Sequence, residues 1–441
     1  MYLRYRYRVE PTGEQRSALA KAFGCARVVY NDGLRIREDA FEAARPFVAD
    51  NELLRIVTTD AKKTPERRWL AEVSAVVLQQ SVADLNRAYR NYFRALAEFK
   101  ATRARREKAA LKVQRPRLKS KHHEQAIRFT ANSRFRVLPN GRLRLPKVGG
   151  LRVRWSRPLP AEPSSVSITL DRAGRYHASF VVEVAEARLP AAEGAVGIDL
   201  GLSSFATLST GEVVANPRWL RQRARALRRS QRNMSRKQKG SKNHEKARRK
   251  LARQHAKVAD SRRDFHHQLS TRLVREHQAV IIETLNIAAL GRSNLAKSVA
   301  DAGWGQFTSM LAYKATMGGR MLVKVDQWYP SSQLCSVCGA RSGPRGRPGL
   351  RLRAWTCCEC GTLNDRDVNA ARNLLAAGRA ATACGPGVRP CASWAVGVEA
   401  GTYLGSPHGH PGPAIRGGED VNIGRLCPVI REELRRARDP S

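Results

Sequence analysis

The sequence of 441 residues predicts an α+β protein with several domains. Three observations support this class. Apolar residues recur at helical spacing in the first hundred residues, alternate in twos over residues 126–185, and later form short continuous runs that end in an acid. The hydrophobic content is 42%, so the chain is long enough for two or three domains and at least one sizeable core.

The charge of the chain indicates its partner. Lys and Arg total 80 against 38 Asp and Glu, which gives a formal charge of +42. Such an excess opposes compaction unless a polyanion neutralises it, and phosphate backbones do so by releasing counterions. We therefore expect nucleic acid as the partner. No run approaches the ~20 apolar residues of a membrane-spanning helix, and the start lacks the apolar core of a signal peptide. We expect a cytoplasmic protein with no membrane partner.

The first elements form a strand and a helical lobe. Residues 2–9 alternate apolar and basic side chains, which predicts a short strand. Thr12–Gln15 has the pattern of a capping box and opens a helix. A second stretch of helical spacing runs from Pro65 to Leu96. The sequence thus predicts an antiparallel helical lobe over residues 11–103.

A basic connection and a β-domain follow the lobe. Basic residues dominate residues 103–121, with Pro116 among them, and this suits either a segment lying along a phosphate backbone or a solvated linker. Arg115 and Lys119 are its candidate nucleic-acid contacts. Residues 126–185 then alternate in twos, with a hairpin turn at 171–174. We expect a small β-domain of barrel type, with residues 2–9 as a candidate strand of it.

The most basic segment of the chain spans residues 218–263. It holds 19 Lys or Arg residues against two acids, and Gly240-Ser241 in its middle suggests the turn of a helical hairpin. A charge run is usually a solvated face, but this density favours a surface for nucleic acid. The candidate contacts that we name on this hairpin are Arg228, Arg229, Arg232 and Lys237.

The end of the chain differs in composition. Gly and Pro supply 18 of the last 66 residues, a proportion typical of disorder. We expect residues 379–441 to be a disordered tail and assign it no chemistry.

Four cysteines predict a zinc ribbon over residues 333–361. They form two C-x2-C pairs separated by 18 residues, and a glycine follows each pair. Four thiolates at this spacing can surround one Zn²⁺ in a closed tetrahedral set, so the ion would be structural. The alternative is reduced thiols without an ion. The predicted ligands are Cys335, Cys338, Cys357 and Cys360, and we take the other five cysteines as spare thiols.

Two apolar runs of strand length end in a carboxylate. Ala195–Gly201 carries Asp199 between apolar and glycine residues, and Ala279–Leu285 carries Glu283. Burying a carboxylate at the end of a strand is costly unless a cation neutralises it. Each acid is thus a candidate metal ligand, although each taken alone could be a turn residue.

A third acid lies beyond the ribbon, where two aspartates open a helix that contains Ala and Leu. Asp365 is the natural N-cap, and Asp367 would then project from the first turn as a ligand. The alternative is that both acids only complement the helix dipole. Three carboxylates on one sheet suit two hard cations about 4 Å apart, which would support phosphodiester cleavage. His266 and His267 lie beside basic residues, and we expect them to contact solvent or phosphate.

The order of these motifs resembles the TnpB family, the OrfB transposase-like proteins of insertion sequences, which are RNA-guided DNA endonucleases related to the type V CRISPR effectors. The likeness also covers Phe23–Asn31 and Leu78–Gln80, so it spans roughly residues 1–378. The motifs that carry it are Gly197–Gly201, Ile282–Asn286, Asp301–Gln306, Tyr329–Ser332, the four cysteines and Asp365–Ala371.

The resemblance implies a multidomain architecture. A RuvC-like, RNase H-type nuclease core would comprise residues 191–332 and 362–378, and in it Asp199, Glu283 and Asp367 would hold two Mg²⁺ ions. A wedge-type β-barrel would comprise residues 1–10 and 104–190, and the helical recognition lobe residues 11–103.

The resemblance also implies the partners. A guide RNA would come from the end of the element itself, and the lobe and barrel would read a short target-adjacent motif in double-stranded DNA. Gln79 aligns with a base-reading glutamine. Base pairing would supply the remaining specificity. We expect a monomer.

Some features depart from the family pattern. Thr284 stands where an acid often follows the family's catalytic glutamate, and the ribbon spacer and the tail are unusually long. The expected function is an RNA-guided, Mg²⁺-dependent DNA endonuclease. The main alternative is an RNA-guided DNA-binding regulator without cleavage, whose members usually lack one or more of the acids that are present here. A transposase that itself joins strands lacks the expected covalent nucleophile.

Overall fold

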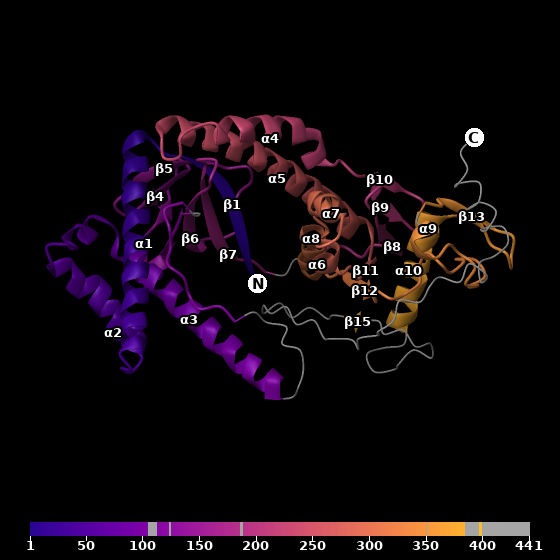
Figure 1. Cartoon of the computed structure of the whole chain (residues 1–441), viewed down its shortest axis with the longest axis horizontal. Coiled ribbons are helices and arrows are strands. Elements are labelled where there is room, and N and C mark those ends of the chain that lie inside the picture. Colours follow the sequence, from indigo (N-terminus) through magenta and orange to yellow (C-terminus); the bar gives the residue numbers. More distant parts are fainter. Residues whose placement is uncertain (105–112, 123–124, 186–187, 350, 384–396, 399–441) are drawn as a thin grey trace. The chain divides into compact units, whose positions relative to one another are not determined.

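The computed structural model of the protein describes residues 1–104, 113–122, 125–185, 188–349, 351–383 and 397–398, and Figure 1 labels their elements. The chain separates into two compact units. Of the described residues, the first unit contains those of 1–185 and 238–253, and the second contains those of 186–237 and 254–398. None of the described helices is long and apolar enough to cross a membrane.

The first unit is built on a seven-stranded antiparallel sheet with the order β2-β6-β7-β1-β5-β4-β3. The strands are β1 Tyr2–Glu10, β2 Gln125–Thr130, β3 Arg136–Val137, β4 Arg142–Leu145, β5 Gly149–Arg154, β6 Pro163–Leu170 and β7 Tyr176–Glu183. The alternation of residues 2–9 predicted a strand, and β1 lies in the middle of this sheet, between β7 and β5. The edge strands β2 and β3 do not pair with each other, so the barrel-type domain is a half-barrel.

Helices cover one face of this sheet. They are α1 Gly13–Glu42 and α3 Ala75–Ala104, and the shorter α2 Asp50–Leu54 packs against α3. Short π and 3-10 turns lie between α2 and α3 at Arg55–Asp60, Ala61–Lys63 and Arg68–Glu72. The capping box at Thr12 and Gln15 is present. Leu19 and Leu78 of the helices share one buried core with Phe129 and Phe180 of the sheet. The predicted boundaries between lobe and barrel therefore mark a change of secondary structure within one core.

The second unit contains a sheet with the order β10-β9-β8-β11-β12-β15. The strands are β8 Ala195–Leu200, β9 Ser204–Leu208, β10 Val213–Ala215, β11 Ala279–Glu283, β12 Met321–Val325 and β15 Gly397–Val398. β8, β11 and β12 are parallel, and β9 returns antiparallel beside β8. The apolar runs that predicted β8 and β11 reflect burial on both faces, which is typical of parallel strands inside a sheet.

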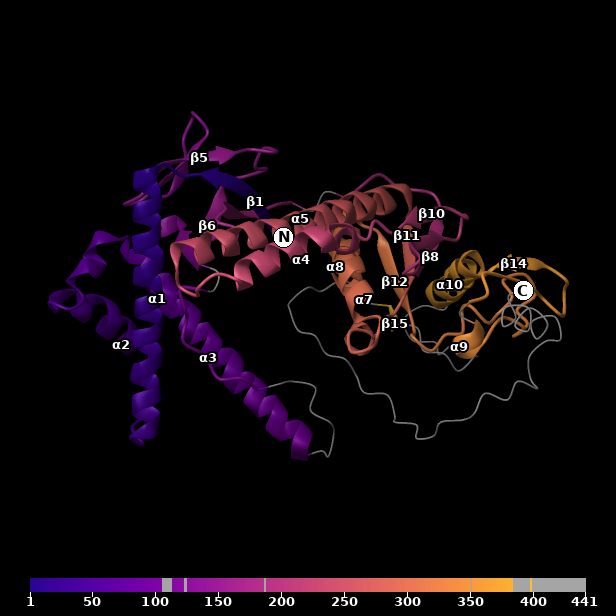
Figure 2. The same ribbon diagram turned by 45° about the horizontal axis from the view of Figure 1, so that its top comes forward.

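Different helices cover the two faces of this sheet, as Figure 2 shows for α8 and α10. On one face, α5 (Lys242–Glu276), α7 (Ala296–Ala302) and α8 (Trp304–Gly318) pack on alternate strand residues, among them Ile198 and Ile282. On the other face, Leu374 of α10 (Arg366–Ala383) packs on Ile281 and Val323. The alternation along the strands thus decides which residues face α10.

The basic hairpin consists of α4 (Trp219–Ser235) and α5, with Gly240 in the turn at φ +86°. α4 has no capping side chain of its own. Instead, the buried carboxylate of Asp301 accepts the backbone N–H groups of Leu220 and Arg221 at 2.8 and 3.1 Å. The helix dipole and the free N–H groups at a helix start both favour a carboxylate there, so Asp301 fixes where α4 begins.

The ribbon segment lies between β12 and α10 and contains α9 (Gly346–Gly349) and the hairpin of β13 (Ala354–Thr356) and β14 (Leu363–Asp365). A short helix, α6 (Ile287–Leu290), follows β11. α10 continues to Ala383, so residues 379–383 of the predicted tail are helical. The rest of that tail, apart from residues 397–398, lies outside the described residues.

Candidate functional site

The parallel register brings two of the predicted acids to neighbouring positions. Ile198 of β8 pairs with Ile282 of β11, so Asp199 and Glu283 are the next residues of adjacent strands, which lie about 4.8 Å apart. Both isoleucines point to the face that α8 covers. Because successive side chains alternate, Asp199 and Glu283 belong to the face that α10 covers.

α10 brings the third acid to the same face. The Asp365 side chain accepts the backbone N–H groups of Asp367 and Val368 at 3.0 and 2.9 Å, so Asp365 is the N-cap, as the sequence predicted. Asp367 then lies in the first turn of the helix. α10 can lie this close to β8 because Gly197 has no side chain: a Cβ there would lie 2.1 Å from the carbonyl oxygen of Ala371.

The three acids affect one another electrostatically. Burial raises the pKa of Asp199 well above its usual value, and the negative charges of Glu283 and Asp367 raise it further, against the opposing effect of Arg366 and Arg353. Burial also raises the pKa of Glu283 to about 7. The site thus holds more negative charge than its surroundings stabilise, which is the condition that favours bound cations.

The carboxylates are a looser set than the cysteines. Among the described residues, only the four ribbon cysteines place three or more ligand atoms within 4.8 Å of one another. Carboxylate oxygens are ligands for hard divalent cations such as Mg²⁺.

Arg353 contacts the carboxylate site from the ribbon segment. Its Nη1 lies 3.2 Å from Asp367 Oδ2, and its Nη2 donates to Ser203 Oγ at 2.7 Å. The side chain is about half exposed, at 55%. Sequence reasoning missed this residue, because a contact across 150 positions leaves no local pattern.

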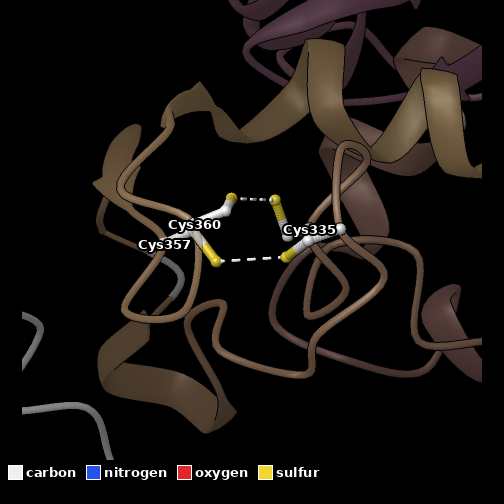
Figure 3. A group of neighbouring side chains, drawn as sticks. Cys335, Cys357 and Cys360 are labelled. Atoms are coloured by element: carbon white, nitrogen blue, oxygen red, sulfur yellow. Dashed lines mark hydrogen bonds between the residues drawn. The ribbon is translucent and has the colours of Figure 1, made fainter.

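The four cysteines form the site that their spacing predicted. The sulfur atoms of Cys335 and Cys360 are 3.7 Å apart, and those of Cys338 and Cys357 are 3.6 Å apart. Figure 3 shows the two pairs of sulfur atoms facing each other. Tetrahedral zinc with Zn–S bonds of about 2.3 Å requires sulfur atoms about 3.8 Å apart, so the cluster fits Zn²⁺. Cys358 is exposed and does not belong to the set.

Two asparagines fasten the ribbon segment to α10. The side-chain amides of Asn369 and Asn373, which are both buried, donate to the carbonyl oxygen of Leu334 at 2.7 and 2.8 Å. Asn369 also accepts the N–H of Ser336 at 2.7 Å, inside the first C-x2-C pair. The helix that carries Asp367 is thus tied directly to the ribbon. The sequence signal for this contact is the spacing of the two asparagines, because residues four apart lie on one face of a helix.

The basic residues predicted on the hairpin lie together. Arg228, Arg229, Arg232 and Lys237 border one surface hollow of about 630 Å³. The other residues around this hollow are Arg225, Asn233 and Arg236. Since α4 contains no acidic residue, its positive charge is not offset within the helix. Their role as nucleic-acid contacts stays a prediction.

The contact candidates of the first unit have different surroundings. Gln79 is exposed on α3. The Arg115 guanidinium lies 4.9 Å from the centre of the Phe41 ring, and the Lys119 ammonium lies 4.0 Å from the centre of the Tyr30 ring. Aromatic faces attract cations, so both basic groups are held on the helical lobe. Both residues are nonetheless exposed, so the interpretation of this segment as a solvated linker stays open.

The expectation for His266 was wrong. Its ring is fully buried beside Phe205 and Phe307, and its two nitrogens lie 2.9 Å from the Ala302 carbonyl oxygen and 3.3 Å from Gln306 Oε1. Arg262 lies one turn before His266 on the same face of α5, and its guanidinium donates to the Ala300 carbonyl oxygen at 2.7 Å. A basic residue nearby in the sequence therefore did not make this face exposed. His266 is a structural residue of the core.

Comparison with known families assigns the chain to a class. Residues 179–294 match the family described as "Probable transposase" under the name OrfB, and residues 304–374 match the TNB domain of Cas12f1-like proteins. Residues 1–45 match a helix-turn-helix family, although in this structure they form β1 and the single long helix α1. The fold and the site thus define an α+β protein with a mixed sheet in its second unit and an inserted zinc-ribbon-like cysteine cluster.

Similar proteins identify the family. The relatives that bear the name "Putative RNA-guided DNA endonuclease" include two that match most of the chain at 30% identity or more. One, from Streptomyces pristinaespiralis, is 46% identical over 88% of this chain and 92% of its own length. The other, called InsQ, from Escherichia coli K12, is 30% identical over 86% of this chain and 93% of its own. The chain belongs to the OrfB, or TnpB, family.

A solved structure supports the fold. The protein chain in a cryo-EM structure of the Cas12f1–sgRNA–target DNA complex aligns over 85% of this chain and 98% of its own length, with a TM-score of 0.50. The sequence identity is 13%, so this likeness concerns the fold alone.

Proposed function

We propose that this protein is an RNA-guided DNA endonuclease of an insertion element, which cleaves target DNA next to a short adjacent motif. The observation that carries the proposal is the site of Asp199, Glu283 and Asp367, in which burial and mutual repulsion raise the pKa of Asp199. All three acids of the family's site are present. The names of the relatives and the charge of +42 support RNA and DNA as partners.

In this mechanism the three carboxylates would hold two Mg²⁺ ions. Bound Mg²⁺ ions would activate a water and stabilise the leaving 3′-oxygen of the phosphodiester. Asp199 and Glu283 are fixed by adjacent strands, and Asp367 by a capped helix, so the ligands are held before the substrate arrives. Arg353, held between Asp367 and Ser203, presents a guanidinium beside the site, where it can contact a phosphate group.

The remaining parts recognise the nucleic acid. The arginines of α4 grip the backbone of the guide RNA or of the heteroduplex by charge, and base pairing supplies the sequence specificity. The half-barrel and the helical lobe, with Gln79 exposed on α3, read the target-adjacent motif. Zn²⁺ in the cysteine cluster is structural, because four thiolates leave no open position on the ion.

The test uses the ribonucleoprotein as purified. Sequencing the RNA that copurifies with the protein defines the guide and hence a matched double-stranded target. With Mg²⁺, the parent protein should cut this target, and Asp199→Ala should bind it without cutting. Asp264→Asn, which changes an exposed acid on α5, is the matched control and should cut normally.

Two outcomes would contradict the proposal. Undiminished cutting by Asp199→Ala would refute the assigned site. Target occupancy without strand breaks at any Mg²⁺ concentration would show the alternative function, an RNA-guided DNA-binding regulator.

A further inference from the structure

Trp328 is the most exposed large apolar side chain of the residues that the structure describes, with 72% of its surface accessible. Tryptophan is highly buried on average, so this exposure is unusual. Its sequence neighbours Asp326 and Gln327 are polar, and the next residue, Tyr329, is partly buried. The ring therefore offers a single aromatic face with polar neighbours along the chain.

A fixed turn presents this ring. Trp328 follows β12, and its backbone N–H donates to Asp326 Oδ1 at 2.8 Å. The N–H of Tyr329 donates to the Asp326 carbonyl oxygen at 3.1 Å. Asp326 thus follows the third parallel strand, as an acid whose side chain holds the turn.

The far side of the turn is anchored on α10. The Tyr329 hydroxyl donates to the Asn373 carbonyl oxygen at 3.3 Å, and its ring packs on the core that contains Leu374 and Val325. Tyr329 points inward and Trp328 points outward from a backbone that is fixed at both ends. A ring held in this way loses little freedom when a ligand stacks on it.

The turn lies at the edge of the sheet that carries the acids. Val325, the last residue of β12, is the register partner of Glu283, and Thr284 N–H donates to the Val325 carbonyl oxygen at 2.8 Å. Adjacent strands are about 4.8 Å apart, and three residues span at most about 11 Å. Trp328 therefore lies within about 16 Å of Glu283 along the backbone, a distance that a few nucleotides cover.

We propose that Trp328 stacks on an unpaired base of the DNA strand that enters the carboxylate site. The identity of this strand rests on the proposed function. Aromatic rings are platforms for single-stranded nucleic acid because every base has a π face, and one such contact changes affinity by roughly tenfold. A single ring with polar neighbours suits a base better than a protein partner, which requires a contiguous apolar patch.

Photo-crosslinking tests the contact without relying on cleavage. Single-stranded DNA that carries 5-iododeoxyuridine is irradiated with the full-length Asp199→Asn protein, and the adduct is mapped by mass spectrometry. We expect the adduct on Trp328. Trp328→Ala should remove it and weaken binding of the same strand about tenfold, whereas Trp328→Phe should retain most of the affinity.

A matched control separates stacking from a general loss of apolar surface. Leu363 on β14 is 71% exposed, so Leu363→Ala removes a comparably exposed apolar side chain and should leave binding and adduct unchanged. Adducts that map elsewhere, or equal affinity of Trp328→Ala and its parent, would overturn the proposal.

The cleavage reaction supplies an independent arm. If the wild-type ribonucleoprotein cuts its target, Trp328→Ala should cut about tenfold more slowly under single-turnover conditions. If the wild type never cuts but the adduct forms on Trp328, the proposed function fails and the stacking contact stands. Suppose that Trp328→Ala cuts the target at the wild-type rate and that no adduct forms on Trp328 of the Asp199→Asn protein. This result would leave the endonuclease proposal intact and overturn the stacking proposal.

Discussion

At the scale of single residues, the site is defined by acids that the protein holds in an unfavourable environment. The pKa of Asp199 is raised by burial, Glu283 and Asp367, and that of Glu283 reaches about 7. A carboxyl group whose pKa is raised in the folded state stays protonated there to a higher pH than in the unfolded chain. As the pH rises, deprotonation of the site therefore favours the unfolded chain and opposes folding.

This imbalance predicts how stability depends on pH. Without divalent cations, the free energy of unfolding should fall as the pH rises from the usual value of 4.5 for Glu283 to about 7, by on the order of 2 kcal/mol. Added Mg²⁺ should oppose this fall, because it stabilises the ionised carboxylates. Chemical denaturation at pH 5 and pH 7.5, with and without Mg²⁺, measures both effects.

Asp199→Asn is the informative variant for this measurement. It should be more stable than the wild type at pH 7.5 without metal and should gain little from Mg²⁺, because one ligand and one charge are gone. A Mg²⁺ response as large as that of the wild type would contradict the site.

At the scale of secondary structure elements, α10 must lie directly on β8 to deliver Asp367. Gly197→Ala should prevent this, since the added Cβ would lie 2.1 Å from a backbone oxygen of α10. We expect loss of cleavage and of the Mg²⁺ response, with zinc content retained. Metal analysis and thermal unfolding of the purified variant check this.

Gly24→Ala is the control for that substitution. No atom lies within 4 Å of a Cβ at this position, which is inside α1, so the change should raise helix stability by about 0.5–1 kcal/mol. Normal cleavage by Gly197→Ala would show that α10 can shift without moving Asp367.

The hairpin element gives a prediction about salt. Affinity for a nucleic acid falls as salt rises, and each arginine that neutralises a phosphate makes the slope of log affinity against log salt steeper by about 0.7–0.9. Replacing Arg228, Arg229 and Arg232 by Gln should therefore weaken RNA binding and reduce the magnitude of this slope by about two. Filter binding between 50 and 300 mM salt would measure the slope.

Arg272→Gln is the control for this prediction, because Glu212 already pairs with the Arg272 guanidinium at 2.6 Å. An equal change of slope in Arg272→Gln would argue against a specific role of α4.

At the scale of the whole molecule, the ribbon is inserted between β12 and α10 and is tied to α10 through Asn369 and Asn373. Cys357→Ser should lower the zinc content and also reduce cleavage strongly, although the three acids are unchanged. The reason is that the ribbon holds the helix that carries Asp367. Zinc analysis and single-turnover cleavage check this.

Cys358→Ser is the matched control for the zinc site. Its thiol is exposed and outside the cluster, so zinc content and cleavage should be those of the wild type. A zinc-depleted Cys357→Ser protein that cleaves normally would separate the ribbon from the active site.

Local patterns in the sequence determined much of this protein. The two apolar runs predicted β8 and β11, the spacing of the cysteines predicted their cluster, and the Asp365 cap distinguished the two acids of α10. Each of these features depends on residues that are close together in the chain. Their physical causes are the periodicity of burial along a strand, the unpaired N–H groups at the start of a helix and the tetrahedral coordination of one ion by four thiolates. The sequence alone therefore predicts them.

Only the tertiary structure decided which distant residues meet. It placed Arg353 against Asp367 and Ser203, Asp301 at the start of α4, His266 inside the core, and Trp328 at the edge of the acids. It also merged the predicted lobe and barrel into one core. These contacts join residues that are far apart in the chain, so the packing of elements decides them, and no local spacing, charge or propensity reports how elements pack.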